Sequence, residues 1–142
     1  MDNSLEMVKK MSEKIKAFNA DNLKALLFDL EHNNFTDRKF DLIFTQMVLH
    51  HVSDVNKIIY KFYKLLNPGG YLAIADLYPE DGSFHSAGFN GYRGFNPDEL
   101  SRKLINSHFE TTSYQKCYVV KKKISDTLIK NFKIFLLIAQ RN

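Results

Sequence analysis

The stretch FDLIFTQMVLHHV, residues 40–52, together with LLNPGGYLAIAD, residues 65–76, decides the fold. The first begins with a nearly continuous apolar run, Phe40–Thr45, typical of a strand buried on both faces of a parallel sheet. Apolar residues then recur at helical spacing after Ser53, whose hydroxyl can cap a helix. The Pro-Gly-Gly of the second stretch ends that helix and supplies a turn before a third element, the strand Tyr71–Ala75. Strand, helix, turn and strand in this order predict a βαβ unit.

Further elements are predicted on both sides of this unit. A helix begins at Asn3 or Ser4, where Glu6 can complete a capping box, and ends near Asn19. The remaining expected elements are a short buried strand over Leu23–Leu30, a long glycine-rich loop over Leu77–Phe95, a helix from Asn96 to about Ser107, and two strands over Phe109–Val120 and Phe132–Gln140.

The order of these elements predicts an α/β fold. Alternating strands and helices are typical of a mostly parallel sheet with helices on both faces. The last two strands follow each other without a helix, so they are expected to form an antiparallel hairpin. The chain shows no internal repeat or linker composition, and a single domain over residues 1–142 is predicted.

The composition narrows the classes of protein to which the chain can belong. A net charge of +4 is mildly basic, but the only dense basic run is Lys121-Lys122-Lys123, and no stripe of alternating basic and aromatic residues accompanies it. Nucleic-acid binding is therefore not expected. The longest apolar run, Phe135–Ala139, is too short to cross a bilayer, and no signal peptide is visible. With Cys117 as its single cysteine, the chain is expected to be cytoplasmic.

The two stretches quoted above resemble the central strand, the following helix and the next strand of the Rossmann-like (class I) S-adenosylmethionine-dependent methyltransferases. The order, the spacing and the ending LLNPGGYL carry the resemblance. It implies a Rossmann-like fold and transfer of a methyl group from S-adenosylmethionine to an acceptor, expected to be a small molecule.

The resemblance also implies a set of cofactor-binding residues. Asp2 corresponds to the acidic residue that accepts hydrogen bonds from both ribose hydroxyls, a task suited to the two oxygens of a carboxylate. Asp29 corresponds to the acceptor for the adenine amine, although it could instead cap a turn. The full implied set is Asp2, Asn3, Met7, Asp29, Leu30, Thr45 and Gln46.

Relative to the family, the sequence lacks the glycine-rich loop that comes before Asp2. The chain is thus expected to be N-terminally truncated, and to bind the cofactor weakly or not at all. The family's missing strand would lie between Leu23–Asp29 and Phe40–Thr45. These two strands must therefore pair directly, leave edges exposed or take strands from another chain. A non-catalytic protein that completes its sheet as a homodimer is the alternative function. His108 replaces a helix-ending glycine and is expected to take positive φ.

Candidate catalytic residues follow from their expected place on the substrate side. His50 and His51 come shortly after the first strand of the βαβ unit, and His85 and Tyr92 lie in the long loop. Any of the four could act as a general base if the acceptor must lose a proton.

No metal site is predicted. Adjacent side chains on an extended segment point to opposite sides, so one ion would not easily bind both His50 and His51. Further ligands would have to come from Asp76, Asp81 or His85.

Overall fold

The computed structural model describes residues 1–110 and 113–142 of the chain. These residues form two compact units, Met1–Phe35 and Thr36–Asn142, each of which is described by itself. Among the described residues, no helix is long and apolar enough to cross a membrane.

The first unit is built around α1 (Leu5–Ala17). Ser4 caps this helix, because its hydroxyl accepts a hydrogen bond from the Met7 N–H. The helix ends two residues before the predicted end, and Asn19 then turns the chain with a φ of 50°. The predicted capping residue and helix are confirmed.

The predicted strand Leu23–Leu30 is wrong. Only an isolated parallel bridge joins Leu27 to Asp2, and Leu23, Leu26 and Leu27 remain exposed. A strand needs a partner along its length, and the chain after Asp2 leaves the bridge at once to begin α1. The apolar run thus has too short a partner in this unit to build a ladder.

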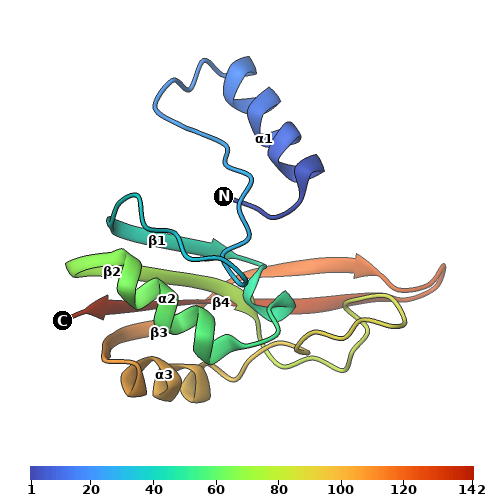
Figure 1. Cartoon of the computed structure of the whole chain (residues 1–142). Coiled ribbons are helices and arrows are strands. Elements are labelled where there is room, and N and C mark those ends of the chain that lie inside the picture. Colours follow the sequence, from blue (N-terminus) through green and yellow to red (C-terminus); the bar gives the residue numbers. More distant parts are fainter. The chain divides into compact units, whose positions relative to one another are not determined.

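The second unit is a sheet with two α-helices and one short 3-10 helix (Figure 1). Its elements are β1 (Phe40–Gln46), the 3-10 helix η1 (Leu49–His51), α2 (Val55–Leu65), β2 (Leu66–Leu77), α3 (Pro97–Asn106), β3 (Phe109–Lys123) and β4 (Ile129–Arg141). The strand order is β1-β2-β4-β3. β1 and β2 are parallel, whereas β4 is antiparallel to both β2 and β3. The predicted βαβ unit and C-terminal hairpin are confirmed, but the sheet of this unit is mixed and not mostly parallel, because two of its three strand pairings are antiparallel.

Two local predictions change in this unit. Asp54, not Ser53, caps α2, since its carboxylate accepts a 2.9 Å hydrogen bond from the Lys57 N–H. The Pro-Gly-Gly segment is not a turn outside the sheet but an irregularity within the longer β2, with Gly69 at a φ of 77°. A Cβ at Gly70 would crowd the Asp41 carbonyl, so this register shift requires glycine.

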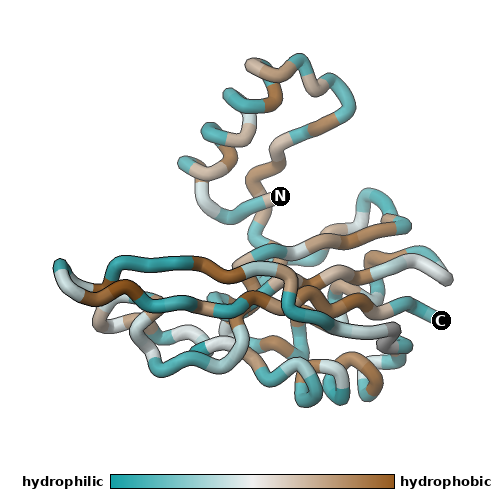
Figure 2. The backbone as a smooth tube through the Cα atoms, turned by 180° about the vertical axis from the view of Figure 1, so that it is seen from behind, coloured by the Kyte–Doolittle hydropathy of each residue, from teal (hydrophilic) through white to brown (hydrophobic). Residues whose placement is uncertain are grey.

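Asn96 caps α3 as predicted, with Pro97 in the first turn. α3 ends at Asn106, and His108 takes the expected positive φ of 69°. Figures 1 and 2 show α2 and α3 along one face of the sheet. Their apolar stripes bury a core with β2 and β4, which includes Ile59, Leu104 and Phe135.

Candidate functional site

The candidate site lies where β1 and β2 end. The two strands are parallel, with Gln46 paired to Ala75, so their carboxyl ends meet at one edge of the sheet. Ligands bind at such edges in open α/β sheets. Met47 follows with a φ of 54° and donates its N–H to the Ala75 carbonyl. The chain turns there into η1, and β2 leads into the loop of residues 78–96.

A buried pair joins these two segments. His50 Nδ1 lies 2.6 Å from Asp76 Oδ1, and the side chains are only 1% and 0% exposed. The carboxylate also accepts hydrogen bonds from the backbone N–H groups of His50 and Leu77. A carboxylate oxygen accepts, so His50 Nδ1 donates to Asp76 Oδ1 and leaves Nε2 as the second ring nitrogen. This Nε2 is buried and has no hydrogen-bond partner among the described residues.

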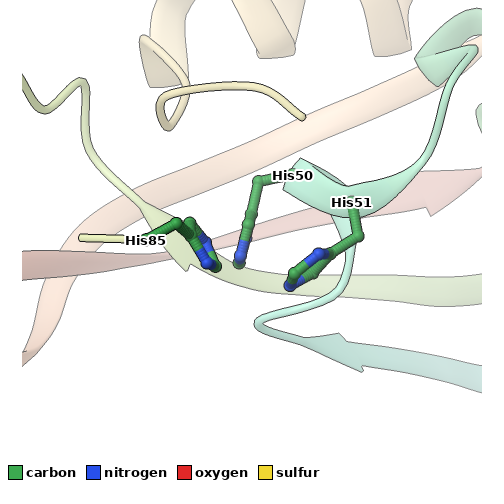
Figure 3. Close-up of side chains that lie close together, drawn as sticks. All are labelled: His50, His51 and His85. Atoms are coloured by element: carbon green, nitrogen blue, oxygen red, sulfur yellow. The ribbon is translucent and has the colours of Figure 1, made fainter. Parts of the chain in front are cut away.

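Three imidazoles gather around that nitrogen. His50, His51 and His85 each offer a ring nitrogen, and these nitrogens lie within 4.8 Å of one another. Figure 3 shows the three rings converging from η1 and the loop. The prediction that His50 and His51 point apart is wrong, because they lie on a 3-10 turn and not on an extended segment. Their ring centroids are 4.2 Å apart.

Burial lowers the pKa of both His51 and His85 below the ordinary histidine value. The charge of His50 lowers the pKa of each further. Lys122 also lowers the pKa of His85, while Glu80 and Asp76 act against the shift. The two rings are therefore held in their neutral, electron-donating form near neutral pH.

The loop of residues 78–96 fixes His85 and closes over η1. The His85 ring stacks on Phe89 with centroids 3.7 Å apart. The Tyr92 N–H donates to the His50 carbonyl over 2.8 Å. A Cβ on Gly91 would collide with the same carbonyl, so this approach needs glycine. The loop is thus held against η1 by backbone contacts.

Tyr92 joins the histidines only through that backbone bond. Its ring packs near Phe95, with centroids 5.2 Å apart. It lines a cavity of about 590 Å³, whose walls come from the start of α2 and from α3 and include Asn56, Glu99 and Lys103. Of the four candidate catalytic residues, the structure brings together the side chains of the three histidines.

The residues expected to contact the cofactor are divided between the two units. Thr45 is buried and Gln46 exposed at the end of β1 in the second unit. In the first unit, the parallel bridge sends Asp2–Asn3 and Asp29–Leu30 out at the same end, and Met7 lies exposed in the first turn of α1.

The two acidic residues of the first unit that are expected to contact the cofactor already make local bonds. Asp2 Oδ1 accepts from the Ser4 N–H over 2.8 Å. Asp29 caps a turn, as the alternative interpretation held: Oδ1 accepts from the N–H groups of Glu31 and His32, and Oδ2 lies 2.8 Å from His32 Nδ1. The His32 side chain holds the pKa of the Asp29 carboxyl below its usual range.

Sequence reasoning named Asp76 only as a possible ligand and missed its role as the partner of His50. The available signal was a single carboxylate at the end of the apolar run LAIAD. A charged residue in that position is rarely buried unless it is paired.

Comparison with known proteins gives the family. A family model described as a methyltransferase domain matches residues 1–74. The chain belongs to this methyltransferase family. The resemblance inferred from the sequence is thereby confirmed, together with the Rossmann-like α/β fold, and the methyl donor of the family is S-adenosylmethionine.

Individual relatives agree with this membership. The chain is 29% identical over 115 residues to an uncharacterized methyltransferase of Schizosaccharomyces pombe. The matched region covers 76% of this chain and 38% of that protein. The chain thus spans well under half the length of this curated relative.

Solved structures of low sequence identity share the fold. A methyltransferase structure from Bacillus halodurans superposes with a TM-score of 0.80 at 14% sequence identity. The superposed region covers 99% of this chain and 80% of the Bacillus halodurans chain. The N-methyltransferase NodS from Bradyrhizobium japonicum, crystallised with S-adenosyl-L-homocysteine, gives a TM-score of 0.59 at 16% identity, with coverage of 88% and 59%.

Proposed function

We propose that this chain is part of a methyltransferase that transfers the methyl group of S-adenosylmethionine to a small molecule. The observation that carries the proposal is the parallel bridge between Asp2 and Leu27, after which Asn3 and Asp29–Leu30 continue in the same direction, inside the residues that match the family. Carboxylates on the two segments joined by this bridge suit a ligand with ribose hydroxyls and an adenine amine.

The residues present fit this cofactor in part. Asp2 would hold the ribose, since one of its oxygens is already oriented by the Ser4 N–H. Asp29 would have to exchange the His32 imidazole for the adenine amine, and Leu30 would lie against the ring. Thr45 and Gln46, at the end of β1 in the second unit, are the other residues that the resemblance assigns to the cofactor. When bound, the cofactor supplies a methyl group already activated by the sulfonium charge, so the chain mainly has to align the acceptor.

The histidine cluster suits an acceptor that must lose a proton. His51 is exposed, and its lowered pKa keeps its ring neutral near neutral pH, as a general base requires. His50 is buried on Asp76 and orients the cluster. The cavity beside Tyr92, of about 590 Å³, is of the size that small ligands occupy.

Calorimetric titration with S-adenosyl-L-homocysteine tests the proposal. We expect saturable binding by the chain, weakened by about tenfold or more in Asp2→Asn because charge-assisted hydrogen bonds to the ribose are lost. Asp21→Asn changes another carboxylate of the same unit and should bind as the unchanged chain does. If neither the chain nor the Asp21→Asn variant binds the ligand, this proposal fails for the chain.

One observation favours a second candidate, a non-catalytic protein that pairs with a second copy of itself. β1 is an edge strand, and its Leu42 and Phe44 side chains are 61% and 56% exposed on one face. Tyr71, paired with Leu42 on β2, continues this apolar surface. An apolar edge of this kind is rarely left open in a monomer. Sedimentation analysis tests it: a dimer supports the candidate and a monomer at high concentration rejects it.

A further inference from the structure

We propose that His50, His51 and His85 form a binding site for a divalent transition-metal ion of the Zn²⁺ type. The proposal goes beyond methyl transfer, because it requires neither the cofactor nor the acceptor. It rests on side chains of the second unit alone.

The first support is the convergence of three imidazole nitrogens. Each residue offers one ligand atom, and all lie within 4.8 Å of one another. A tetrahedral zinc ion with Zn–N bonds of about 2.0–2.1 Å sets its ligand nitrogens about 3.4 Å apart. Small side-chain rotations would bring the three nitrogens from their present separations to the separation that a zinc ion needs. The exposed His51 can make the largest of these rotations. Three protein ligands then leave one position open for water, as in sites that are not purely structural.

The second support is independent of that convergence. The Nε2 atoms of His50 and His85 are buried and have no hydrogen-bond partner among the described residues. His50 is 1% exposed, and its ring lies between those of His51 and His85 (Figure 3). Buried nitrogens of this kind are normally satisfied by a donor, a water or a metal ion. An ion between the three rings would satisfy both at once.

Asp76 supplies the third support. Imidazoles that bind metal ions usually donate their other N–H to a carboxylate, which fixes the tautomer and makes the ligand more basic. His50 has this arrangement, with Nδ1 held on Asp76 Oδ1 at 2.6 Å. Asp76 is a positioning residue here and is not itself placed among the ligands.

The charges around the cluster permit a cation. Asp76 and Glu80 are the negative groups that act on His85, whereas His50 and Lys122 act in the opposite sense. The Lys122 ammonium lies over the Phe84 ring, 5.1 Å from its centroid, and also donates to the Phe84 carbonyl, so part of its charge is engaged. Neutral imidazoles prefer Zn²⁺ and its neighbours in the transition series over Mg²⁺ or Ca²⁺.

Zinc titration of the tag-free chain tests the site. The protein carries Cys117→Ser, which removes the exposed thiol as a competing ligand. It is stripped with a chelator and titrated with Zn²⁺ against a chromophoric indicator at neutral pH. We expect one equivalent of Zn²⁺ to bind, and the affinity to fall by about tenfold or more in His51→Asn and in His85→Asn.

His108→Asn is the matched control, because it removes a histidine outside the cluster at a positive φ that asparagine tolerates. It should bind Zn²⁺ as the unchanged chain does. Asp76→Asn should lower the affinity by about 10–100-fold. Circular dichroism verifies that each variant is folded. If the other variants are not folded, the result for His51→Asn alone decides whether the site exists, because this variant is altered at an exposed side chain.

Co²⁺ provides a second measurement, since its visible absorption reports the ligand geometry. A tetrahedral spectrum that disappears in His51→Asn supports the site. Absence of stoichiometric Zn²⁺ binding, or equal affinity in His51→Asn and His108→Asn, overturns it. Neither outcome depends on binding of S-adenosylmethionine, so this proposal and the methyltransferase proposal fail separately.

Discussion

Asp76 Oδ1 lies 2.6 Å from His50 Nδ1, and this buried pair ties the end of β2 to the turn that follows β1. The bond positions one imidazole so that its second nitrogen faces His51 and His85 (Figure 3). The same pair would orient a ligand for a metal ion or support a general base. A bound ion would occupy the lone pair that a base needs, so the two roles exclude each other at His51.

Removing the Asp76 carboxylate should strongly destabilise the second unit. Asp76→Ala leaves the His50 ring N–H and two backbone N–H groups without their acceptor in a buried place. We expect the free energy of unfolding to fall by about 3–5 kcal/mol. Urea denaturation measures it. Asp126→Ala, which removes an exposed carboxylate paired with Lys123, should change it by less than about 0.5 kcal/mol. Equal costs in the two variants would contradict the structural importance of the pair.

Gly91→Ala should displace the loop of residues 78–96 from η1. The added Cβ would collide with the His50 carbonyl, which is backbone and cannot move aside cheaply. We expect a loss of about 1–3 kcal/mol in unfolding free energy. The Tyr92 amide, which donates to that carbonyl, should also lose protection from hydrogen exchange.

Gly88→Ala is the contrasting variant for this test. A Cβ there meets no described atom within 4 Å, and the cost comes from its φ of 91° alone. The Tyr92 amide should remain protected in Gly88→Ala. If both variants expose this amide alike, the close approach of Gly91 does not hold the loop.

Phe44→Glu should prevent self-association if the exposed face of β1 binds a second copy. The glutamate would place a charge within the apolar surface formed with Leu42 and Tyr71. We expect the mass from sedimentation to shift from dimer to monomer, since burial of an unpaired charge is costly. Ile105→Glu alters an equally exposed apolar side chain on α3 and should leave the dimer intact. Dissociation by both variants would argue for a different interface.

The sequence predicted those elements that depend on local signals. The N-cap at Asn96 and the apolar stripe of α2 act within a few residues, so both helices could be found from the pattern. The run Leu23–Leu30 could not be judged in this way, because a strand exists only if a distant segment pairs with it. Among the described residues, its one β-bridge joins Leu27 to Asp2.

The histidine cluster depends on non-local contacts in the same way. The left-handed turn at Met47 and the tie to Asp76 convert an expected extended segment into η1. His85 reaches the cluster only because its loop folds back over that turn. The four candidate residues were named from the sequence, but the convergence of the three histidines on a common point required the three-dimensional arrangement.

Acid should release the loop from β4 through Asp81. Its carboxylate accepts hydrogen bonds from Lys130 Nζ at 2.5 Å and from the Ser83 hydroxyl and N–H. These bonds, that of Lys130 first, hold the pKa of Asp81 well below its ordinary value of 3.8. The unfolded chain therefore binds the proton more readily, and the stabilisation is complete above 3.8 and is lost as the pH falls below it.

Asp81→Asn isolates this contribution. The variant should unfold at lower urea concentration than the unchanged chain at neutral pH, by a small margin because the ion pair is exposed. The margin should shrink as the pH is lowered below 3.8, because the unfolded form of the unchanged chain then binds a proton at Asp81 more readily than the folded form does. Lys130→Met, which removes the partner, should have a smaller effect in the Asp81→Asn background than alone. A margin that stays constant down to strongly acidic pH would mean that the packing of the loop, and not the charge of Asp81, holds it against β4.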